Sequence, residues 1–185
     1  PKGQSVTFRW ASKKDILSID HKGEGKPWVT IQSIVAIPLK ESISSGYKIK
    51  KKIVPIEQKE KQKFSIGDIV KISLEIEAHS DMTWVVVNDP IPAGATILRT
   101  GLGRDSEILS KENIKNEWLF PVFEERSFEA YRAYYDFLPK GKWTLEYIIR
   151  FNNAGVFNLP QTRVEAIYYP EMFGEIPNRT IEIMK

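Results

Sequence analysis

The sequence contains no cysteine, and this absence removes three kinds of chemistry. A disulfide-stapled scaffold, a zinc site with Cys ligands and a thiol nucleophile each need that residue. The chain must therefore be stabilised by a hydrophobic core. Its 185 residues are enough to form one, because folding at this size buries roughly 70% of the unfolded surface.

Histidine is scarce too, with only His21 and His79 in the chain. His21 lies in a turn-like segment rich in lysine and glycine, and His79 follows a predicted strand beside Ser80. Consecutive residues at a strand end point to opposite faces, which argues against a His79–Ser80 catalytic pair. Two histidines without cysteine do not make a typical structural zinc site either.

The acidic residues offer only a weak alternative. The aspartates are scattered among predicted turns, at Asp68, Asp81, Asp89, Asp105 and Asp136. Oxygen ligands of this kind leave a calcium site open, but no spacing matches a known calcium-binding loop. We therefore predict no catalytic residue, no metal site, no cofactor and no enzymatic activity.

Long apolar runs are missing as well. No segment approaches the roughly 18 apolar residues of a transmembrane helix. The sequence begins at Pro1, without a methionine or a signal-like segment, so we expect a piece of a longer protein. Any membrane anchor or export signal would then lie outside these residues.

The formal net charge is only +3, although lysines concentrate between Lys48 and Lys63. Nucleic-acid binding favours arginines and interleaved aromatic side chains, and this stretch has only Tyr47 at its start. We predict a solvated hairpin and edge strand here, where lysines also discourage edge-to-edge pairing. No nucleic-acid partner is expected.

The dominant period along the chain is two. Val70, Ile72, Leu74 and Ile76 alternate with polar residues, which predicts a strand with one solvated face. Phe123 to Leu138 fits both helical and strand spacing, and its aromatic density favours the strand. Further strands are predicted at residues 6–10, 16–19, 28–39, 47–56, 82–87, 143–151, 163–168 and 180–184, and a loop with one helical turn at 105–116. Many short strands separated by turns predict an all-β fold, an antiparallel β-sandwich.

An apolar run begins at the end of the strand predicted at 163–168. It comprises Ile167, Tyr168, Tyr169, Met172 and Phe173, with Pro170 among them. Half of such a run can face the core and the rest can cap the end of the sandwich. The other interpretation is a surface that docks on another domain or partner. Tyrosine suits docking because its ring buries area while its hydroxyl stays hydrated.

At these residues the chain resembles the C-terminal part of the bacterial alpha-2-macroglobulin family, large protease-trapping proteins related to complement. One similar segment reads Trp-Val-Val-Val-Asn-Asp-Pro-Ile-Pro-Ala-Gly, at residues 84–94. The others are residues 25–28, 64–70, 138–141, 147–157 and 164–174. Together they run over most of the chain and keep their order, so the resemblance is specific.

The resemblance implies a macroglobulin-like β-sandwich with an N-terminal β-strand extension. Residues 46–185 would form the last domain of a multidomain protein. Residues 1–45 would be strands continuing from a preceding small β domain.

The resemblance also implies a function. In the family, a thioester between a Cys and a Gln stays unreacted until a protease cleaves a bait region. This chain has no Cys, so the thioester would belong to another part of the protein. A Met-Tyr pair on a late strand of the last domain leans over the thioester in relatives, and the matching positions here are Ile167 and Tyr168. Ile167 keeps apolar bulk but lacks the flexibility of methionine.

We therefore expect a non-enzymatic module of a bacterial alpha-2-macroglobulin-like protease inhibitor, which shields the thioester of a neighbouring domain until protease cleavage. Tyr169, Met172 and Phe173 would extend the interface. The expected partners are the thioester domain of the same polypeptide and, through the full-length protein, target proteases. The resemblance implies a periplasmic location, with any inner-membrane anchor outside this chain.

Two other hypotheses remain. The first is a carbohydrate- or surface-binding β-sandwich that uses exposed tryptophans as stacking platforms, drawn from Trp10, Trp28, Trp84, Trp118 and Trp143. A structure can test it, because coplanar exposed indoles in a groove favour sugar binding. The second is a hydrolase built around His79, which requires a hydroxyl within hydrogen-bond reach of the imidazole.

Overall fold

The computed structural model describes residues 5–9, 16–26, 28–32, 39–98 and 120–185. Its contacts divide the chain into two units, Pro1–Ile37 and Pro38–Lys185, and each is described by itself. The loop predicted at residues 105–116 lies outside the described residues. In the described ranges, no helix has the length and hydropathy needed to cross a membrane.

The first unit carries no strand over its described residues. Apolar side chains such as Phe8, Ile16 and Trp28 are exposed there, Trp28 to 99%. The strands predicted at 6–10, 16–19 and 28–39 are therefore not formed where they are described, because a strand needs a neighbour to complete its hydrogen bonds. The assignment of residues 1–45 to a preceding β domain stays a prediction.

The second unit is built from strands. They are β1 (Ile43–Ser45), β2 (Tyr47–Glu57), β3 (Phe64–Ser65), β4 (Ile69–Ala78), β5 (Met82–Pro90), β6 (Thr96–Ile97), β7 (Phe123–Arg126), β8 (Ala130–Leu138), β9 (Gly141–Arg150), β10 (Gly155–Phe157), β11 (Thr162–Ala166), β12 (Tyr169–Ile176) and β13 (Ile181–Met184). β1 precedes residue 46 yet pairs with β12 inside this unit.

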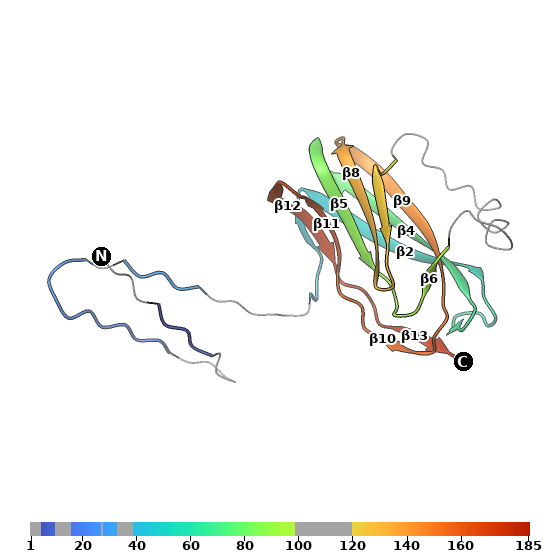
Figure 1. The fold of residues 1–185 in the computed structure, drawn as a ribbon, viewed down its shortest axis with the longest axis horizontal. Helices are drawn as coiled ribbons and strands as arrows, with labels where there is room; N and C mark the ends of the chain where they lie inside the picture. The colour runs from blue at the N-terminus through green and yellow to red at the C-terminus, as the bar shows by residue number, and fades with distance from the viewer. Residues whose placement is uncertain (1–4, 10–15, 27, 33–38, 99–119) are drawn as a thin grey trace. The chain divides into compact units, whose positions relative to one another are not determined.

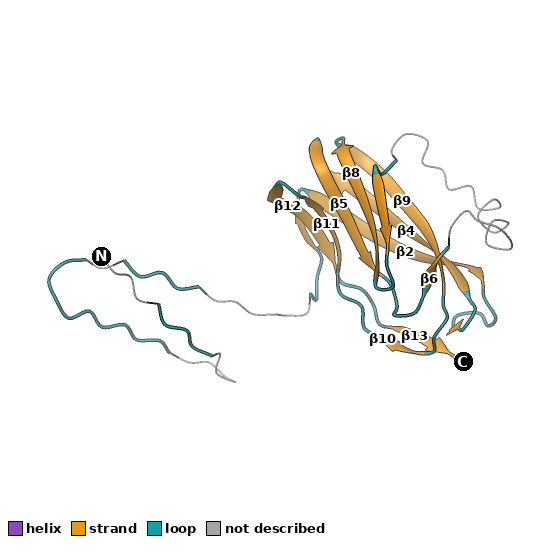
Figure 2. Ribbon diagram, in the orientation of Figure 1, coloured by secondary structure: helices purple, strands orange, loops and turns teal. Residues whose placement is uncertain are grey.

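The strands form two main layers, shown in Figures 1 and 2. One layer is a six-stranded sheet in the order β1-β12-β11-β5-β8-β7, and the other is a four-stranded sheet in the order β2-β4-β9-β6. A small third sheet, β10-β13-β3, contains the parallel pair of β13 with β3, whereas the other described ladders are antiparallel. The predicted all-β sandwich with antiparallel sheets is confirmed.

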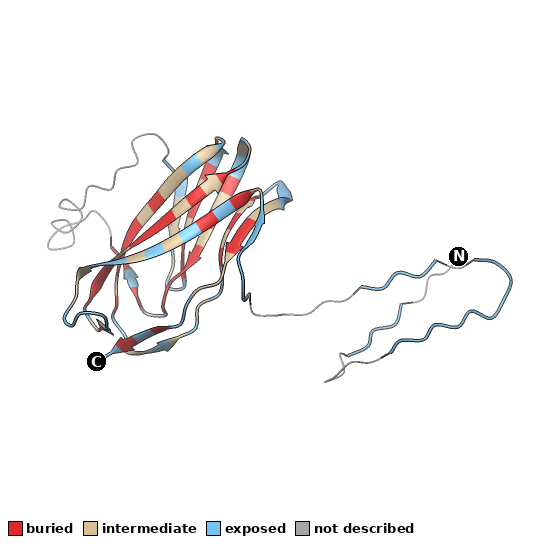
Figure 3. Cartoon of the chain, turned by 180° about the vertical axis from the view of Figure 1, so that it is seen from behind, coloured by how far each residue is buried: buried red, intermediate tan, exposed pale blue. Residues whose placement is uncertain are grey.

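The core lies between the two main sheets. The inward residues of β4, among them Val70, Leu74 and Ile76, are at most 2% exposed, and they cluster with Val85 of β5 and Tyr131 of β8. Figure 3 shows the resulting stripes of buried and more exposed residues along the strands. Truncating one of these side chains to alanine costs about 2–5 kcal/mol, because the cavity adds to the lost burial.

The lysine-rich strand β2 is an edge strand of the four-stranded sheet, as predicted. Its outward residues Lys48, Lys50 and Lys52 are exposed; Lys48 and Lys50 lie opposite Glu77 and Glu75 of β4, and Lys52 lies opposite Ser73. Lys52 forms an ion pair with Glu75. Acidic residues of β4 thus lie beside these lysines, and opposite charges on neighbouring strands favour the ladder.

Residues 123–138 form β7 and β8, so the strand interpretation of this ambiguous segment is correct. The strand predicted at 163–168 ends earlier, at Ala166. Ile167 and Tyr168 form the turn of a β11–β12 hairpin, and the ladder shifts register between Glu165 and Ala166. The chain then continues as β12, which the sequence analysis did not predict as a strand.

Candidate functional site

The turn between β11 and β12 presents apolar side chains to solvent. Ile167 is 45% exposed, Tyr168 69% and Tyr169 51%. β11 is held between β5 and β12 in the middle of the six-stranded sheet, so the turn is carried by a paired hairpin. An exposed apolar turn on a well-paired hairpin is an arrangement suited to docking, because docking costs little additional ordering.

Trp84 of β5 lies directly against this turn. The backbone N–H of Ile167 donates a hydrogen bond of 2.8 Å to the carbonyl oxygen of Trp84. The rings of Trp84 and Tyr168 meet edge to face, with centroids 6.4 Å apart and planes at 86°. We call Trp84, Ile167, Tyr168 and Tyr169 the apolar tip. The sequence analysis named Trp84 only as a candidate sugar platform.

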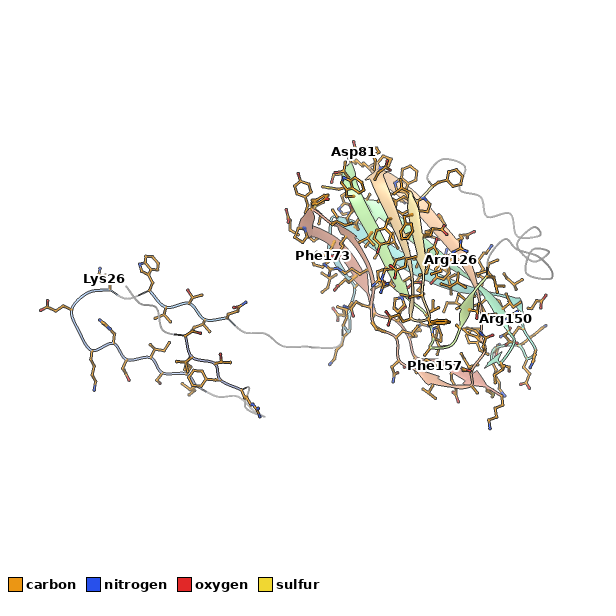
Figure 4. The ribbon with its side chains drawn as sticks, in the orientation of Figure 1. Lys26, Asp81, Arg126, Arg150, Phe157 and Phe173 are labelled. Atoms are coloured by element: carbon orange, nitrogen blue, oxygen red, sulfur yellow. The ribbon has the colours of Figure 1, made fainter. Side chains whose placement is uncertain are left out.

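The two other residues predicted for the interface lie differently. Met172 is half-buried and packs against the core. Phe173 is also half-buried, and the Arg163 guanidinium lies 4.7 Å from the centre of its ring; Figure 4 labels Phe173 on β12. Both side chains are therefore partly committed to packing within the sandwich, and their interface role stays a prediction, like that of Tyr169.

No catalytic arrangement surrounds His79. Its side chain is exposed, its backbone N–H donates to the carbonyl of Gly46, and no hydrogen bond joins its imidazole to the Ser80 hydroxyl in the described structure. Asp81, labelled in Figure 4 at one end of the sandwich, accepts a hydrogen bond of 2.7 Å from the Lys140 backbone N–H. Over the described ranges, no group of three or more His, Cys, Asp or Glu residues could hold a metal ion.

The sugar-platform arrangement is also not formed by the described tryptophans of the sandwich. Trp84 contacts Tyr168, while Trp143 is half-buried, packs against the core and donates its indole N–H to the Pro139 carbonyl at 2.7 Å. Trp28 belongs to the first unit, and Trp10 and Trp118 lie outside the described residues. The two sandwich indoles thus have separate packing partners.

A groove of about 690 Å³ runs along the inner edge of β2 towards β13. Its walls combine the apolar side chains of Ile53, Phe64 and Ile181 with polar ones, and Glu182 is the only carboxylate among its lining residues. No histidine is among its lining residues, and the Thr180 hydroxyl on its wall donates a hydrogen bond of 2.7 Å to the Asn158 side-chain oxygen.

The most elaborate polar arrangement in the described structure is buried. Asp89, which is 0% exposed, accepts hydrogen bonds from the hydroxyls of Tyr147 and Thr162 and forms an ion pair with Lys51. Burial, and next the charge of Asp89, raise the pKa of Tyr147 well above its usual value. This network ties β2, β5, β9 and β11 together, which is a structural task. The sequence analysis named Asp89 only among the scattered aspartates and within the segment at residues 84–94.

Comparison with known proteins identifies the family to which the chain is similar. A family model described as the bacterial alpha-2-macroglobulin MG10 domain matches residues 46–171. A curated Nostoc protein named an alpha-2-macroglobulin homolog is 29% identical over 111 residues, which cover 60% of this chain and 6% of that protein. The chain thus spans only a small part of the length of that relative.

Solved structures share the fold. Trypsin-activated alpha-2-macroglobulin from Escherichia coli superposes with a TM-score of 0.65 at 18% identity, over 79% of this chain and 11% of that one. Salmonella alpha-2-macroglobulin reacted with methylamine gives a TM-score of 0.64 at 21% identity, over 79% of this chain and 10% of that one. At such identities these structures support the sandwich fold alone. Since the family model matches more than half of its residues, the chain belongs to the bacterial alpha-2-macroglobulin family.

Proposed function

We propose that this chain is the C-terminal, non-enzymatic module of a bacterial alpha-2-macroglobulin-like protease inhibitor, and that its apolar tip shields a thioester in a neighbouring domain until a protease cleaves the inhibitor. The observation that carries the proposal is Tyr168, a large side chain that is 69% exposed at the turn of a well-paired hairpin. Such a side chain contributes little to its own core and is available to cover another surface.

The chemistry of a thioester explains why a cover is useful. Water and amines attack its carbonyl carbon, and the thiolate leaves. An apolar ring over the bond keeps these nucleophiles away without catalysing anything. The thioester then reacts only while the cover is displaced, so its rate of loss follows the population of the uncovered state. Protease cleavage would release the cover through a domain movement.

The relatives are consistent with this chemistry. The Salmonella protein was reacted with methylamine, an amine nucleophile, and the E. coli protein was activated with trypsin. Carried over to this chain, the partners are the thioester domain of the same polypeptide and, through the full-length protein, target proteases. We also propose that residues 1–45 continue a preceding β domain.

The test is Tyr168→Ala in the full-length protein, with methylamine added and the released thiol measured over time. This chain has no cysteine, so every released thiol comes from another part of the protein. Losing a docked aromatic ring removes about 1.5–3 kcal/mol, which predicts thiol release at least about tenfold faster. Tyr168→Phe keeps the ring and should react at nearly the unmodified rate.

Phe128→Ala is the matched control. Phe128 is 85% exposed and lies beyond the Ala130 end of β8, whereas Trp84 lies near the Leu138 end. Phe128→Ala therefore removes an exposed aromatic ring that lies away from the apolar tip, and it should leave the rate of thiol release unchanged. A Tyr168→Ala rate equal to that of the unmodified protein would remove Tyr168 from the mechanism.

We further propose a periplasmic location for the full-length protein, held by any membrane anchor outside this chain. Fractionation of cells that express the full-length protein checks this location directly. Recovery with cytoplasmic markers would contradict it.

A further inference from the structure

Trp84 has an unusual backbone conformation for a strand residue. Its φ is +54°, in the left-handed region, and among the described non-glycine residues only Gln62 shares a positive φ. A bulky residue in this region is strained by about 1–3 kcal/mol and persists only where its surroundings enforce it. Strain of this kind in a half-exposed residue beside a candidate site suggests a functional reason for the residue found there.

The β11–β12 turn is hydrogen-bonded to this distorted position of β5. Thr83 and Val85 are paired with Phe137 and Tyr135 on β8, whereas Trp84 between them has no ladder partner on that side. Its carbonyl oxygen instead accepts the N–H of Ile167 at 2.8 Å. This hydrogen bond connects Trp84 of β5 to the first residue of the exposed turn.

The indole then limits where the Tyr168 ring can go. The edge-to-face contact with Trp84, at a centroid distance of 6.4 Å, is the ring contact that the structure gives for Tyr168. The Tyr168 hydroxyl has no hydrogen-bond partner among the described residues. A tyrosine that is 69% exposed would otherwise sample several rotamers, and each lost rotamer costs free energy on docking.

We propose that Trp84 is a positioning residue: it holds the Tyr168 ring in its outward, docking-ready orientation, and so lowers the rate at which the thioester is exposed. The inference rests on the proposed function, and it adds a residue on a different strand to the shielding machinery. Edge-to-face aromatic pairs contribute about 0.5–1.5 kcal/mol, so losing the indole should raise the uncovered population about 2- to 10-fold.

Two substitutions test whether an aromatic ring is needed at position 84. Trp84→Asn removes the indole and suits the left-handed conformation, because asparagine tolerates positive φ. Trp84→Phe keeps an aromatic ring and the backbone strain. In the full-length protein, Trp84→Asn should release thiol about 2- to 10-fold faster with methylamine, and Trp84→Phe should stay within about twofold of the unmodified rate. Equal rates for both variants would overturn the role of the ring.

A double-mutant cycle distinguishes positioning from direct contact. If Trp84 acts through Tyr168, then Trp84→Asn should add nothing to the rate of Tyr168→Ala. If the two effects multiply, Trp84 covers the partner surface independently and the positioning role is overturned. If Tyr168→Ala has no effect by itself, the proposed shielding function fails first, and this outcome is separate from a failure at Trp84.

Protein stability is the remaining control. Thermal unfolding of each full-length variant should show a midpoint for Trp84→Asn no lower than that of the unmodified protein, because asparagine relieves the strain at positive φ, and a midpoint for Trp84→Phe within the change expected from a surface position. A faster thiol release that is accompanied by a lower midpoint, and that Trp84→Phe does not rescue, would indicate general loosening of the sandwich and would also overturn the proposal.

Discussion

Lys51 and Asp89 face each other inside the sandwich, with the ammonium nitrogen 2.6 Å from a carboxylate oxygen and the two side chains 9% and 0% exposed. They come from different sheets, Lys51 from β2 and Asp89 from β5. Lys51 also donates to the Asn178 side-chain oxygen at 3.0 Å. The pair is therefore a polar cross-link between the two layers, beside the hydrogen bond from the Tyr147 hydroxyl to Asp89.

Breaking this pair from one side should be costly. Asp89→Ala leaves a buried lysine without its counter-charge, and we expect a loss of about 3–5 kcal/mol in the free energy of unfolding. Lys51→Met should lose a similar amount, because it leaves the buried Asp89 carboxylate without its counter-charge. The double variant Lys51→Met with Asp89→Ala should lose clearly less than the sum of the two, because no unpaired charge remains. Urea denaturation of the chain measures all three, and strict additivity would contradict the coupling.

Tyr47 is expected to be suboptimal for stability. Its side chain is 0% exposed, and its hydroxyl is the only buried side-chain polar atom without a hydrogen-bond partner in the described part of the chain. Tyr47→Phe removes that unsatisfied group, so we expect about 1 kcal/mol of added stability. Tyr147→Phe is the matched control, because its hydroxyl donates to Asp89, and it should lose about 1–3 kcal/mol. Destabilisation by Tyr47→Phe would show that this hydroxyl has a partner after all.

Alkaline pH should weaken the sandwich. Burial raises the pKa of Tyr47 to about 12, and burial also raises the pKa values of Tyr131, Tyr135 and Tyr147. The neutral tyrosines of the folded state thus hold their protons more tightly than those of the unfolded chain. This contribution is complete below pH 10, about the unfolded pKa, and is lost as the pH rises from 10 towards 12.

The expected slope is about 1.4 kcal/mol of stability lost per pH unit for each such tyrosine. Denaturation midpoints between pH 8 and pH 11.5 test it, and Tyr47→Phe should reduce the slope by about one such increment. A stability that stays flat across this range would contradict the burial of these hydroxyls.

Gly174 marks a close crossing of two strands. A Cβ atom at this position of β12 would lie 2.4 Å from the carbonyl oxygen of Tyr47, which is backbone and cannot move aside cheaply. We expect Gly174→Ala to cost about 1–3 kcal/mol, because β12 or β2 must shift. Val156→Ala, at a position 66% exposed, should stay within about 0.5 kcal/mol of the unmodified chain. Thermal or urea unfolding checks both, and equal stability would show that the strands have room to separate.

Strand β12 shows why part of the fold could not be predicted from the sequence. Pro170 and Gly174 read as strand breakers, yet both are accommodated. Pro170 lies in the exposed start of β12, where β1 does not reach, because β1 pairs only with residues 173–175. Gly174 is required by the approach of Tyr47. Neither circumstance is visible in a local window of sequence.

The residues of the candidate site were likewise predicted only in part. The apolar run left a core-facing and an exposed interpretation open, and the side chains of Ile167 and Tyr168 are both exposed at the turn of the hairpin. Met172 and Phe173 belong to the same run but turn partly inward. Trp84 was absent from the predicted shielding residues, because its contact with Tyr168 joins two distant parts of the chain.

Alternation of apolar and polar residues was sufficient to predict β4, because a strand places successive side chains on opposite faces. Aromatic density favoured a strand for the segment of β8, whose spacing also fitted a helix, and the many short strands separated by turns predicted the all-β class. The segments resembling relatives were sufficient for the family. Sequence could not tell which distant residues become neighbours. The charge pair of Lys51 with Asp89 and the close approach at Gly174 arise only when the two sheets pack, and the contact of Tyr168 with Trp84 arises only when β11 pairs with the distant strand β5. Local propensity carries no information about such contacts.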